Sequence, residues 1–253
     1  MRAVLFDLDG TLMDHDAARV AGLAAHLAAL MPGLSADELA RLDGEWRRLE
    51  SLHYDEYAAG RCSFQEQRRR RVRGLHAALE QTVPGDAEAD AWFADYLGHY
   101  RGVWSAFDDV FPGLAALAAA HPEAALGVVT NGEGEPQRAK LAAIGLAERF
   151  PVVVASAEAG MAKPDPAIFA LACERLGVAP SAAAHVGDRL DLDAQGAAAA
   201  GLRGIWLDRT GAASLGSVAA GRRACANVPR PAAGVTTIAT LHELPAALAA
   251  SSR

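Results

Sequence analysis

Short apolar runs recur along this chain of 253 residues, and they constrain its fold more strongly than any other feature. None of the runs alternates apolar with polar residues, so each predicts a strand that is covered on both faces. In the second half of the chain, helical patterns separate the runs, which is typical of a mainly parallel sheet between layers of helices. The predicted strands are residues 3–6, 125–129, 152–155, 183–186, 205–207 and, last, 235–238. The sequence therefore predicts the α/β class.

A long segment between the first two predicted strands, residues 15–107, has a different character. It holds capping-box patterns at Ser35-Ala36-Asp37-Glu38 and Ser63-Phe64-Gln65-Glu66. After Asp86, apolar residues recur at helical spacing: Trp92, Phe93, Tyr96, Leu97 and Tyr100. An insertion of this size predicts a separate all-helical domain. We expect core residues 1–14, a helical cap at 15–107 over the strand ends, and a second core segment at 108–253.

Further signals predict where elements of the second half begin and end. A helix after Pro164 is expected to end near Gly177, and another is expected from about residue 191 to 200, before Gly201. The stretch 208–234 is rich in Gly, Ala and Pro and is expected to be irregular. Thr240-Leu241-His242-Glu243 is a third capping box and predicts a last helix.

Composition argues against several classes of protein. Hydrophobic residues make up 51% of the chain and the mean hydropathy is +0.08, so the chain can bury a substantial core. The formal net charge of −7 gives no electrostatic reason to bind a nucleic acid polymer. Cys62, Cys173 and Cys225 form no C-x-x-C pair, which favours reduced, packed thiols. No apolar leader precedes Asp7 and no apolar run is long enough for a membrane span, so we expect a cytoplasmic protein.

Polar residues gather after the predicted strands in four places. Asp7-Leu8-Asp9-Gly10-Thr11 comes directly after the first strand, and Thr130-Asn131-Gly132 comes after the second. Lys163-Pro164 precedes a helix, and Gly187-Asp188 opens an acidic stretch that runs to Asp193. Each piece alone is typical of a helix cap or a solvated charge. Because the carboxyl ends of parallel strands meet at one edge of a sheet, together they predict a single crevice.

These residue types indicate a site for a metal ion and an anion. Several carboxylates that converge without compensating cations draw in a proton or a cation, and Mg²⁺ prefers oxygen ligands together with a substrate phosphate. Lys163 and the donors around Thr130 and Asn131 remain to hold an anion, which suits phosphoryl chemistry. Gly10 tolerates a positive φ and lets the chain coil, so that one aspartate can act as nucleophile and its neighbour in proton transfer.

On these motifs the chain resembles the haloacid dehalogenase-like (HAD) hydrolase superfamily, with a Rossmann-like core and a helical cap inserted after the first motif. The resemblance implies that Asp7 is the nucleophile that takes up the phosphoryl group. It implies that Asp9 is the acid/base, which protonates the leaving oxygen and later activates water. The resemblance also implies phosphate binding by Thr130, Asn131 and Lys163. It implies Mg²⁺ binding by Asp7, the backbone carbonyl of Asp9 and Asp188, with Asp193, and as a second candidate Asp191, as supporting acids.

Other activities of this superfamily stay open as alternatives. Its dehalogenases lack an acid/base aspartate such as Asp9, which favours phosphoryl transfer over carbon–halogen cleavage. Phosphonoacetaldehyde hydrolases need a cap lysine for a Schiff base, and residues 15–107 contain no lysine. A phosphomutase uses the same two aspartates, but Thr130-Asn131-Gly132 resembles the nucleotidase and N-acylneuraminate-9-phosphatase type of subfamily. A binding protein of the same fold without turnover is a further alternative.

The sequence therefore predicts a phosphoric monoester hydrolase that depends on Mg²⁺ and acts through an aspartyl-phosphate. Its expected partner is a small phosphorylated metabolite, such as a nucleotide or a sugar phosphate, and neither a nucleic acid nor a membrane. Cap side chains, among them Arg61, Gln67 and Arg68, are expected to select the substrate. A monomer and a homodimer are both compatible with the sequence.

Three further features are interpreted as structural. The run of residues 68–71 with Arg73 is expected to form a solvated helix face. Because successive helical residues turn by about 100°, at most two of these guanidinium groups could face the crevice. Arg189 stands where the superfamily often has a small hydroxylic residue, and its side chain is expected to turn to solvent. His185 lies inside a predicted strand and is expected to be a packed, hydrogen-bonded core residue.

Overall fold

The computed structural model describes residues 1–211 and 234–250, which form two compact units. The first unit comprises Met1–Asp14 and the described part of Ser105–Arg253, and the second comprises His15–Trp104. The domain boundaries expected from the sequence, at residues 14/15 and 107/108, stay a prediction.

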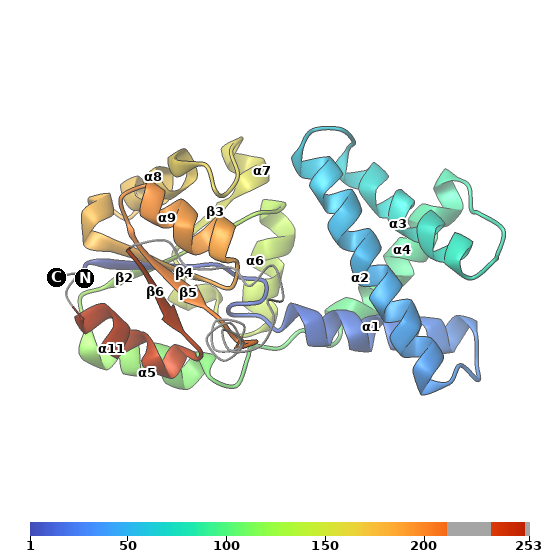
Figure 1. Cartoon of the computed structure of the whole chain (residues 1–253), viewed down its shortest axis with the longest axis horizontal. Helices are drawn as coiled ribbons and strands as arrows, with labels where there is room; N and C mark the ends of the chain where they lie inside the picture. Colours follow the sequence, from blue (N-terminus) through green and yellow to red (C-terminus); the bar gives the residue numbers. More distant parts are fainter. Residues whose placement is uncertain (212–233, 251–253) are drawn as a thin grey trace, which may run out of the picture. The chain divides into compact units, whose positions relative to one another are not determined.

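The first unit is built on a six-stranded sheet in which all neighbouring strands are parallel. The order across the sheet is β3-β2-β1-β4-β5-β6 (Figure 1). The strands are β1 Ala3–Phe6, β2 Ala125–Thr130, β3 Val152–Ala155, β4 Ala183–Gly187, β5 Arg203–Leu207 and β6 Val235–Ile238. The predicted fold class is confirmed, and the predicted strands agree with the observed ones to within two residues at each end.

Helices cover both faces of this sheet. Figure 1 shows α8 and α9 on one face and α5 and α11 on the other. In residues 1–14, 105–211 and 234–250 the α-helices are α5 Val110–Ala120, α6 Gly134–Ala143, α7 Ser156–Ala159, α8 Pro166–Arg175, α9 Gly196–Ala199 and α11 Leu244–Ala249, with 3₁₀ turns at Ala147–Arg149, Pro180–Ala182 and Leu241–Glu243. The central strands β1 and β4 are buried at every residue. Cover on both faces explains why the strands appear in the sequence as unbroken apolar runs.

The helix predicted from about residue 191 to 200 differs from the observed structure. The chain first makes a π-helical stretch, η3, at Leu190–Gln195 and only then forms α9. Within η3 the Asp193 side chain turns inward and accepts a hydrogen bond from the Arg189 backbone N–H at 3.0 Å. Such wide turns widen a helix locally and often accompany functional sites.

The second unit is formed by α1 His15–Leu30, α2 Ala36–Ala58, α3 Phe64–Ala78 and α4 Asp86–Arg101. Ser35 and Glu38 form the predicted capping box at the start of α2, and Ser63 accepts a hydrogen bond from the Glu66 backbone N–H at the start of α3. The Trp46 ring is fully buried and packs against aromatic rings of α4, those of Trp92, Phe93 and Tyr96.

The arginine run in α3 is only partly the solvated face that the sequence suggested. Arg69 and Arg70 form ion pairs with carboxylates of α4 and α2 at 2.6 to 2.9 Å. Arg71 contradicts the expectation, because it is only 6% exposed. Its guanidinium lies 2.8 Å from a Glu50 carboxylate oxygen and stacks over the Trp46 ring at 4.4 Å. The apolar rings and the carboxylate together offset the cost of burying this charge.

Hydrogen bonds hold together the two points at which the chain leaves and re-enters the first unit. Asp14 donates its backbone N–H to the Ser105 carbonyl at 3.0 Å, and Phe107 donates to the Leu12 carbonyl at 3.2 Å. Arg209 donates to both carboxylate oxygens of Asp109 at 3.0 Å and stacks on the Phe107 ring. The insertion thus starts and ends at one fixed point beside the first motif.

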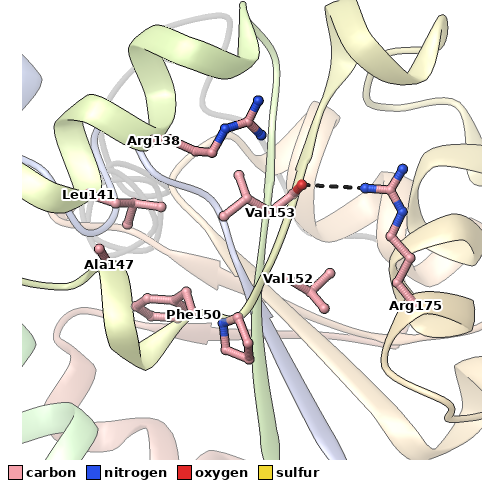
Figure 2. A pocket seen from close by; sticks show the side chains of 8 residues that line it. Arg138, Leu141, Ala147, Phe150, Val152, Val153 and Arg175 are labelled. Carbon is pink, nitrogen blue, oxygen red and sulfur yellow. Dashed lines mark hydrogen bonds between the residues drawn. The ribbon is translucent and has the colours of Figure 1, made fainter.

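A pocket of about 380 Å³ lies beside the edge strand β3. Figure 2 shows Arg138 and Arg175 on either side of Val153, and Arg175 donates to the Val153 carbonyl at 3.5 Å. The lining residues are Arg138, Leu141, Ala147, Phe150, Pro151, Val152, Val153 and Arg175. The residues predicted for the crevice are not among them, so this pocket is separate from the site described below.

The remaining expectations concern cysteines, irregular segments and membranes. Cys173 is buried, Cys62 is half-buried, and both thiols are free. Cys225 and most of the stretch expected to be irregular lie outside the described residues. Among the helices of the described ranges, none combines the length and the hydropathy that crossing a bilayer requires.

Two glycines of the second unit provide a test of its packing. Gly22 in α1 faces α4, where an added Cβ would lie 2.7 Å from the Tyr100 Cα, whereas a Cβ on Gly44 in α2 would meet nothing within 4 Å. We expect Gly22→Ala to lower stability by about 1–3 kcal/mol through overpacking. Gly44→Ala should raise it by roughly 0.5–1 kcal/mol, because alanine is the better helix former. Urea unfolding followed by circular dichroism measures both, and equal stabilisation by the two variants would contradict the close packing of α1 on α4.

Candidate active site

Three neighbouring strands present polar residues at the same edge of the sheet. Phe6, the last residue of β1, lies opposite Val128 of β2 and Val186 of β4. Asp7 directly follows Phe6, Thr130 ends β2, and Asp188 directly follows β4. The parallel register therefore brings these three residues to adjacent strand ends, which is where open α/β sheets bind ligands.

Lys163 joins two carboxylates of this edge. Its Nζ atom donates to Asp7 Oδ1 and to Asp193 Oδ1, both at 2.6 Å, and all three residues are at most 6% exposed. His185, fully buried in β4, has its Nε2 atom 3.1 Å from Asp193 Oδ1. The side chains thus form one buried chain of charge-assisted hydrogen bonds. His185 is the packed, hydrogen-bonded residue that the sequence suggested.

Asn131 fixes the backbone that carries Lys163. Its side-chain amide donates to the Lys163 carbonyl at 3.0 Å, and its side-chain oxygen accepts from the Lys163 backbone N–H at 2.8 Å. The amide nitrogen and the amide oxygen are therefore both engaged with the loop between α7 and α8. The Asn131 side chain therefore holds the Lys163 backbone in place from both of its polar atoms.

Burial has the largest effect on the acidity of the carboxyl groups. It raises the pKa of Asp7 well above its ordinary 3.8, against the attraction of Lys163. It also raises the pKa of Asp188 to about 6, and the neighbouring Asp193 carboxylate adds to this shift. Burial acts upward on Asp193 too, but Lys163 and the hydrogen bond to His185 outweigh it and lower the pKa of that group. Lys163 thus stabilises Asp193 as a carboxylate, while Asp7 and Asp188 resist ionisation.

Asp7, Asp188 and Asp193 form a carboxylate cluster in which one oxygen from each residue lies within 4.8 Å of the others. The first-motif loop is shaped around it: Gly10 has φ +87°, and a Cβ there would lie 2.6 Å from Asp188 Oδ2. Thr11 Oγ1 accepts a hydrogen bond from the Asp188 backbone N–H at 3.0 Å. Glycine is required at position 10 both for its backbone conformation and for this close approach.

The Asp9 side chain is held by helix α6, apart from the carboxylate cluster. Lys140 Nζ lies 2.7 Å from each Asp9 carboxylate oxygen. Gln137 Nε2 donates to Asp9 Oδ2 at 2.9 Å and to Thr130 Oγ1 at 2.6 Å. Sequence reasoning assigned no role to Lys140 or Gln137. The available signal was that the chain contains only two lysines, Lys140 and Lys163.

Arg189 turns away from the carboxylate cluster, as the sequence suggested. Its guanidinium pairs with Asp191 at 3.1 Å, and both side chains are about 60% exposed, 59% and 61%. Asp191 therefore does not join Asp188 and Asp193 in the cluster.

The chain belongs to the haloacid dehalogenase-like hydrolases, because a model of that family matches residues 1–201. The match includes all of the residues brought together above.

Curated relatives of this chain are phosphatases. It is 32% identical over 231 residues to the phosphoserine phosphatase of Thermus thermophilus, with 83% of this chain and 89% of the relative covered. It is 36% identical over 214 residues to the glyceraldehyde 3-phosphate phosphatase of Methanopyrus kandleri, with coverage of 83% and 84%. The prediction that the chain is a phosphoric monoester hydrolase of this family is confirmed.

A solved structure of a different activity is also similar. The 2-haloacid dehalogenase of Pseudomonas syringae pv. tomato is 29% identical, superposes with a TM-score of 0.61, and is covered over 98% of both chains. The shared fold therefore does not by itself decide between phosphatase and dehalogenase chemistry.

The raised pKa of Asp188 predicts how the stability of the metal-free protein depends on pH. Its folded value of about 6 lies above the ordinary 3.8, so the folded state binds this proton more tightly than the unfolded chain does. The resulting stabilisation is complete below pH 3.8 and is lost as the pH rises through about 6. In a chelator, Asp188→Asn should therefore melt about 2 °C or more above the wild type at pH 7.5, and the difference should shrink towards pH 5.

Asp191→Asn is the matched control, because that side chain is 61% exposed and pairs with Arg189 outside the carboxylate cluster. It should change the melting temperature little and equally at both pH values. If Asp188→Asn raised the melting temperature equally at both pH values, the charge on Asp188 would not destabilise the metal-free protein.

Proposed function

We propose that this protein is a Mg²⁺-dependent phosphatase that hydrolyses a small phosphorylated metabolite through an aspartyl-phosphate on Asp7. The main support is the position of Asp7 at the end of β1, where it is buried, hydrogen-bonded to Lys163 at 2.6 Å and close to Asp188. A carboxylate held at a strand end by a lysine can attack phosphorus while cations neutralise the phosphoryl oxygens.

Each predicted residue has a role in this proposal. Asp7 attacks the phosphoryl group and Asp9 gives a proton to the leaving oxygen, then takes one from the water that hydrolyses the intermediate. Lys163 contacts Asp7, and Thr130 is linked to Asp9 through Gln137. Both are proposed to contact the phosphoryl oxygens, together with the backbone amide of Asn131. Asp193 acts through Lys163, which it holds at 2.6 Å.

The donor set fits a hard divalent cation. Asp7 and Asp188 have raised pKa values and contribute oxygen ligands, whereas the Asp193 oxygens already accept from Lys163 and the Arg189 backbone. We therefore propose Asp7, Asp188 and the backbone carbonyl of Asp9 as ligands for Mg²⁺, with Asp193 as a supporting acid. When bound, the ion would neutralise charge on the phosphoryl oxygens.

Two other activities use similar side chains. The presence of Asp9 disfavours a 2-haloacid dehalogenase, because carbon–halogen cleavage releases a halide that needs no proton. A phosphomutase would use the same aspartates and differs only in whether the phosphoryl group passes to water or to a second hydroxyl. The relatives that are phosphatases favour water as the acceptor.

The substrate is proposed to be selected by the insertion, residues 15–107. The two phosphatase relatives act on different substrates, as their names state, at similar identity to this chain. Of the cap residues suggested by the sequence, Gln67 is buried, so Arg61 and Arg68 are the better candidates. We also propose a cytoplasmic location and a monomer or homodimer, without a nucleic acid or membrane partner.

The function is tested by screening phosphorylated metabolites for phosphate release. The wild type should turn over at least one nucleotide, sugar phosphate or similar small ester, and Asp7→Asn should be slower by about three orders of magnitude or more, because the attacking group is removed. Circular dichroism should show the variant to be folded. Turnover by Asp7→Asn within tenfold of the wild type would exclude Asp7 as the nucleophile.

The same assay tests the metal and the main alternative. Chelation should abolish phosphate release and Mg²⁺ should restore it. Full activity after exhaustive chelation would exclude the metal site, and chloride release from 2-chloropropionate would favour the dehalogenase.

The role of the insertion is tested by exchange. Replacing residues 15–107 with the equivalent segment of a related phosphatase should change the ranking of kcat/KM among substrates, because the chemistry lies in the other unit. The need for Asp7 should persist in the chimaera. An unchanged ranking would show that the insertion does not select the substrate.

A further inference from the structure

Both lysines of the chain contact an aspartate of the first motif. The chain has 24 basic residues, but Lys140 and Lys163 are the only lysines. Lys163 pairs with Asp7 and Lys140 pairs with Asp9. The sequence predicted that Asp7 and Lys163 lie in one crevice, whereas the contact of Lys140 with Asp9 joins residues 131 positions apart and has no role in the function proposed above.

Lys140 and Gln137 reach Asp9 from the same face of α6. They lie three residues apart in this helix, so their side chains are neighbours on its surface. Lys140 is 9% exposed and Gln137 is 3% exposed. A lysine at this depth requires a partner, and the Asp9 carboxylate supplies both of its oxygens at 2.7 Å.

Gln137 links this ion pair to the phosphate side of the site. Its Nε2 atom donates to Asp9 Oδ2 at 2.9 Å and also to the Thr130 hydroxyl oxygen at 2.6 Å. One buried amide therefore fixes the distance between a residue proposed for proton transfer and a residue proposed for phosphate contact. We call Gln137 and Lys140 the α6 clamp.

We infer that the α6 clamp consists of positioning residues, which hold the Asp9 carboxyl group where it can exchange a proton with the reacting oxygen. This inference rests on the proposed function. In the first step the Asp9 proton passes to the leaving oxygen as the bond from that oxygen to phosphorus breaks. In the second step the Asp9 carboxylate takes a proton from the attacking water, which restores the acid. The clamp itself neither gains nor loses a proton.

The alternative is that the clamp merely packs α6 against the sheet. A packing role would not depend on the leaving group or on the presence of Asp9. The contacts, however, go to the Asp9 carboxylate and the Thr130 hydroxyl, which are the reacting and binding atoms of the proposal. The two roles therefore predict different kinetics.

The test compares Lys140→Met with Lys140→Arg, and uses Arg138→Met as the matched control. Arg138 lies in the same helix, but it is exposed and pairs with Glu158. Phosphate release is measured from 4-nitrophenyl phosphate, whose leaving group needs little protonation, and from phenyl phosphate, whose leaving group needs more. The two esters have similar shapes, so a difference between them reports proton transfer rather than binding.

We expect Lys140→Met to lower kcat by about 100-fold on phenyl phosphate and by about tenfold on 4-nitrophenyl phosphate, with KM within about threefold of the wild type. Lys140→Arg should recover most of the loss, because a guanidinium can donate to both oxygens of one carboxylate. Arg138→Met should stay within about twofold of the wild type. In an Asp9→Asn background, Lys140→Met should cost less than about threefold, because the clamp acts through Asp9.

Gln137→Leu provides a second variant if Lys140→Met does not fold, and it should show the same greater loss on phenyl phosphate. Equal losses on the two esters, or a loss from Lys140→Met that persists in the Asp9→Asn background, would overturn the inference while leaving the phosphatase intact. A wild type that releases phosphate from neither ester nor from any metabolite screened would overturn the proposed function, and the clamp's role with it.

Discussion

The Lys163 ammonium between Asp7 and Asp193 is the contact on which the arrangement of the site depends. It joins the end of β1, the loop between α7 and α8 and the η3 turn after β4, at 2.6 Å on each side. Asn131 fixes the Lys163 backbone from β2, and His185 supports Asp193 from inside β4. Buried ion pairs contribute little net stability, because desolvation offsets most of the attraction. Their directionality instead specifies one arrangement of four chain segments that are distant in sequence.

The Lys163 ammonium does not balance the charges of Asp7, Asp188 and Asp193, and the first-motif loop is shaped around this excess of carboxyl groups. Lys163 lowers the pKa of Asp193, while burial raises the pKa values of Asp7 and Asp188. Gly10 lets the first-motif loop pass so close to Asp188 that no side chain fits between them. The site is therefore built to bring carboxyl groups together at a cost, and the binding of a cation would offset that cost. This reasoning supports the proposed metal ligands independently of any relative.

The sequence predicted most of the sheet, because strands buried on both faces are continuous apolar runs whose ends are marked by polar residues. It predicted the convergence of Asp7, Thr130, Lys163 and Asp188 for the same reason. In the structure the π-helical turn at Leu190–Gln195 aims the Asp193 side chain inward. The sequence did not predict this turn, because apolar periodicity does not distinguish wide helical turns from regular ones. Nor did it predict the burial of Arg71, which depends on a tertiary contact with Glu50. For Lys140 the only signal in the sequence was the rarity of lysine, because its partner Asp9 is remote in the chain.

The two lysines of the chain face acceptors of different geometry. Lys163 must donate to two separate carboxylates from one point, which a compact ammonium can do and a planar guanidinium fork cannot do without displacing one of them. Lys140 instead faces the two oxygens of a single carboxylate, a geometry that a guanidinium also matches. Arginine serves elsewhere in the described structure, as in the bidentate pair of Arg209 with Asp109 and the stacking of Arg71 on Trp46. The shape of the acceptor thus accounts for lysine at position 163, where a guanidinium would displace one of the two carboxylates.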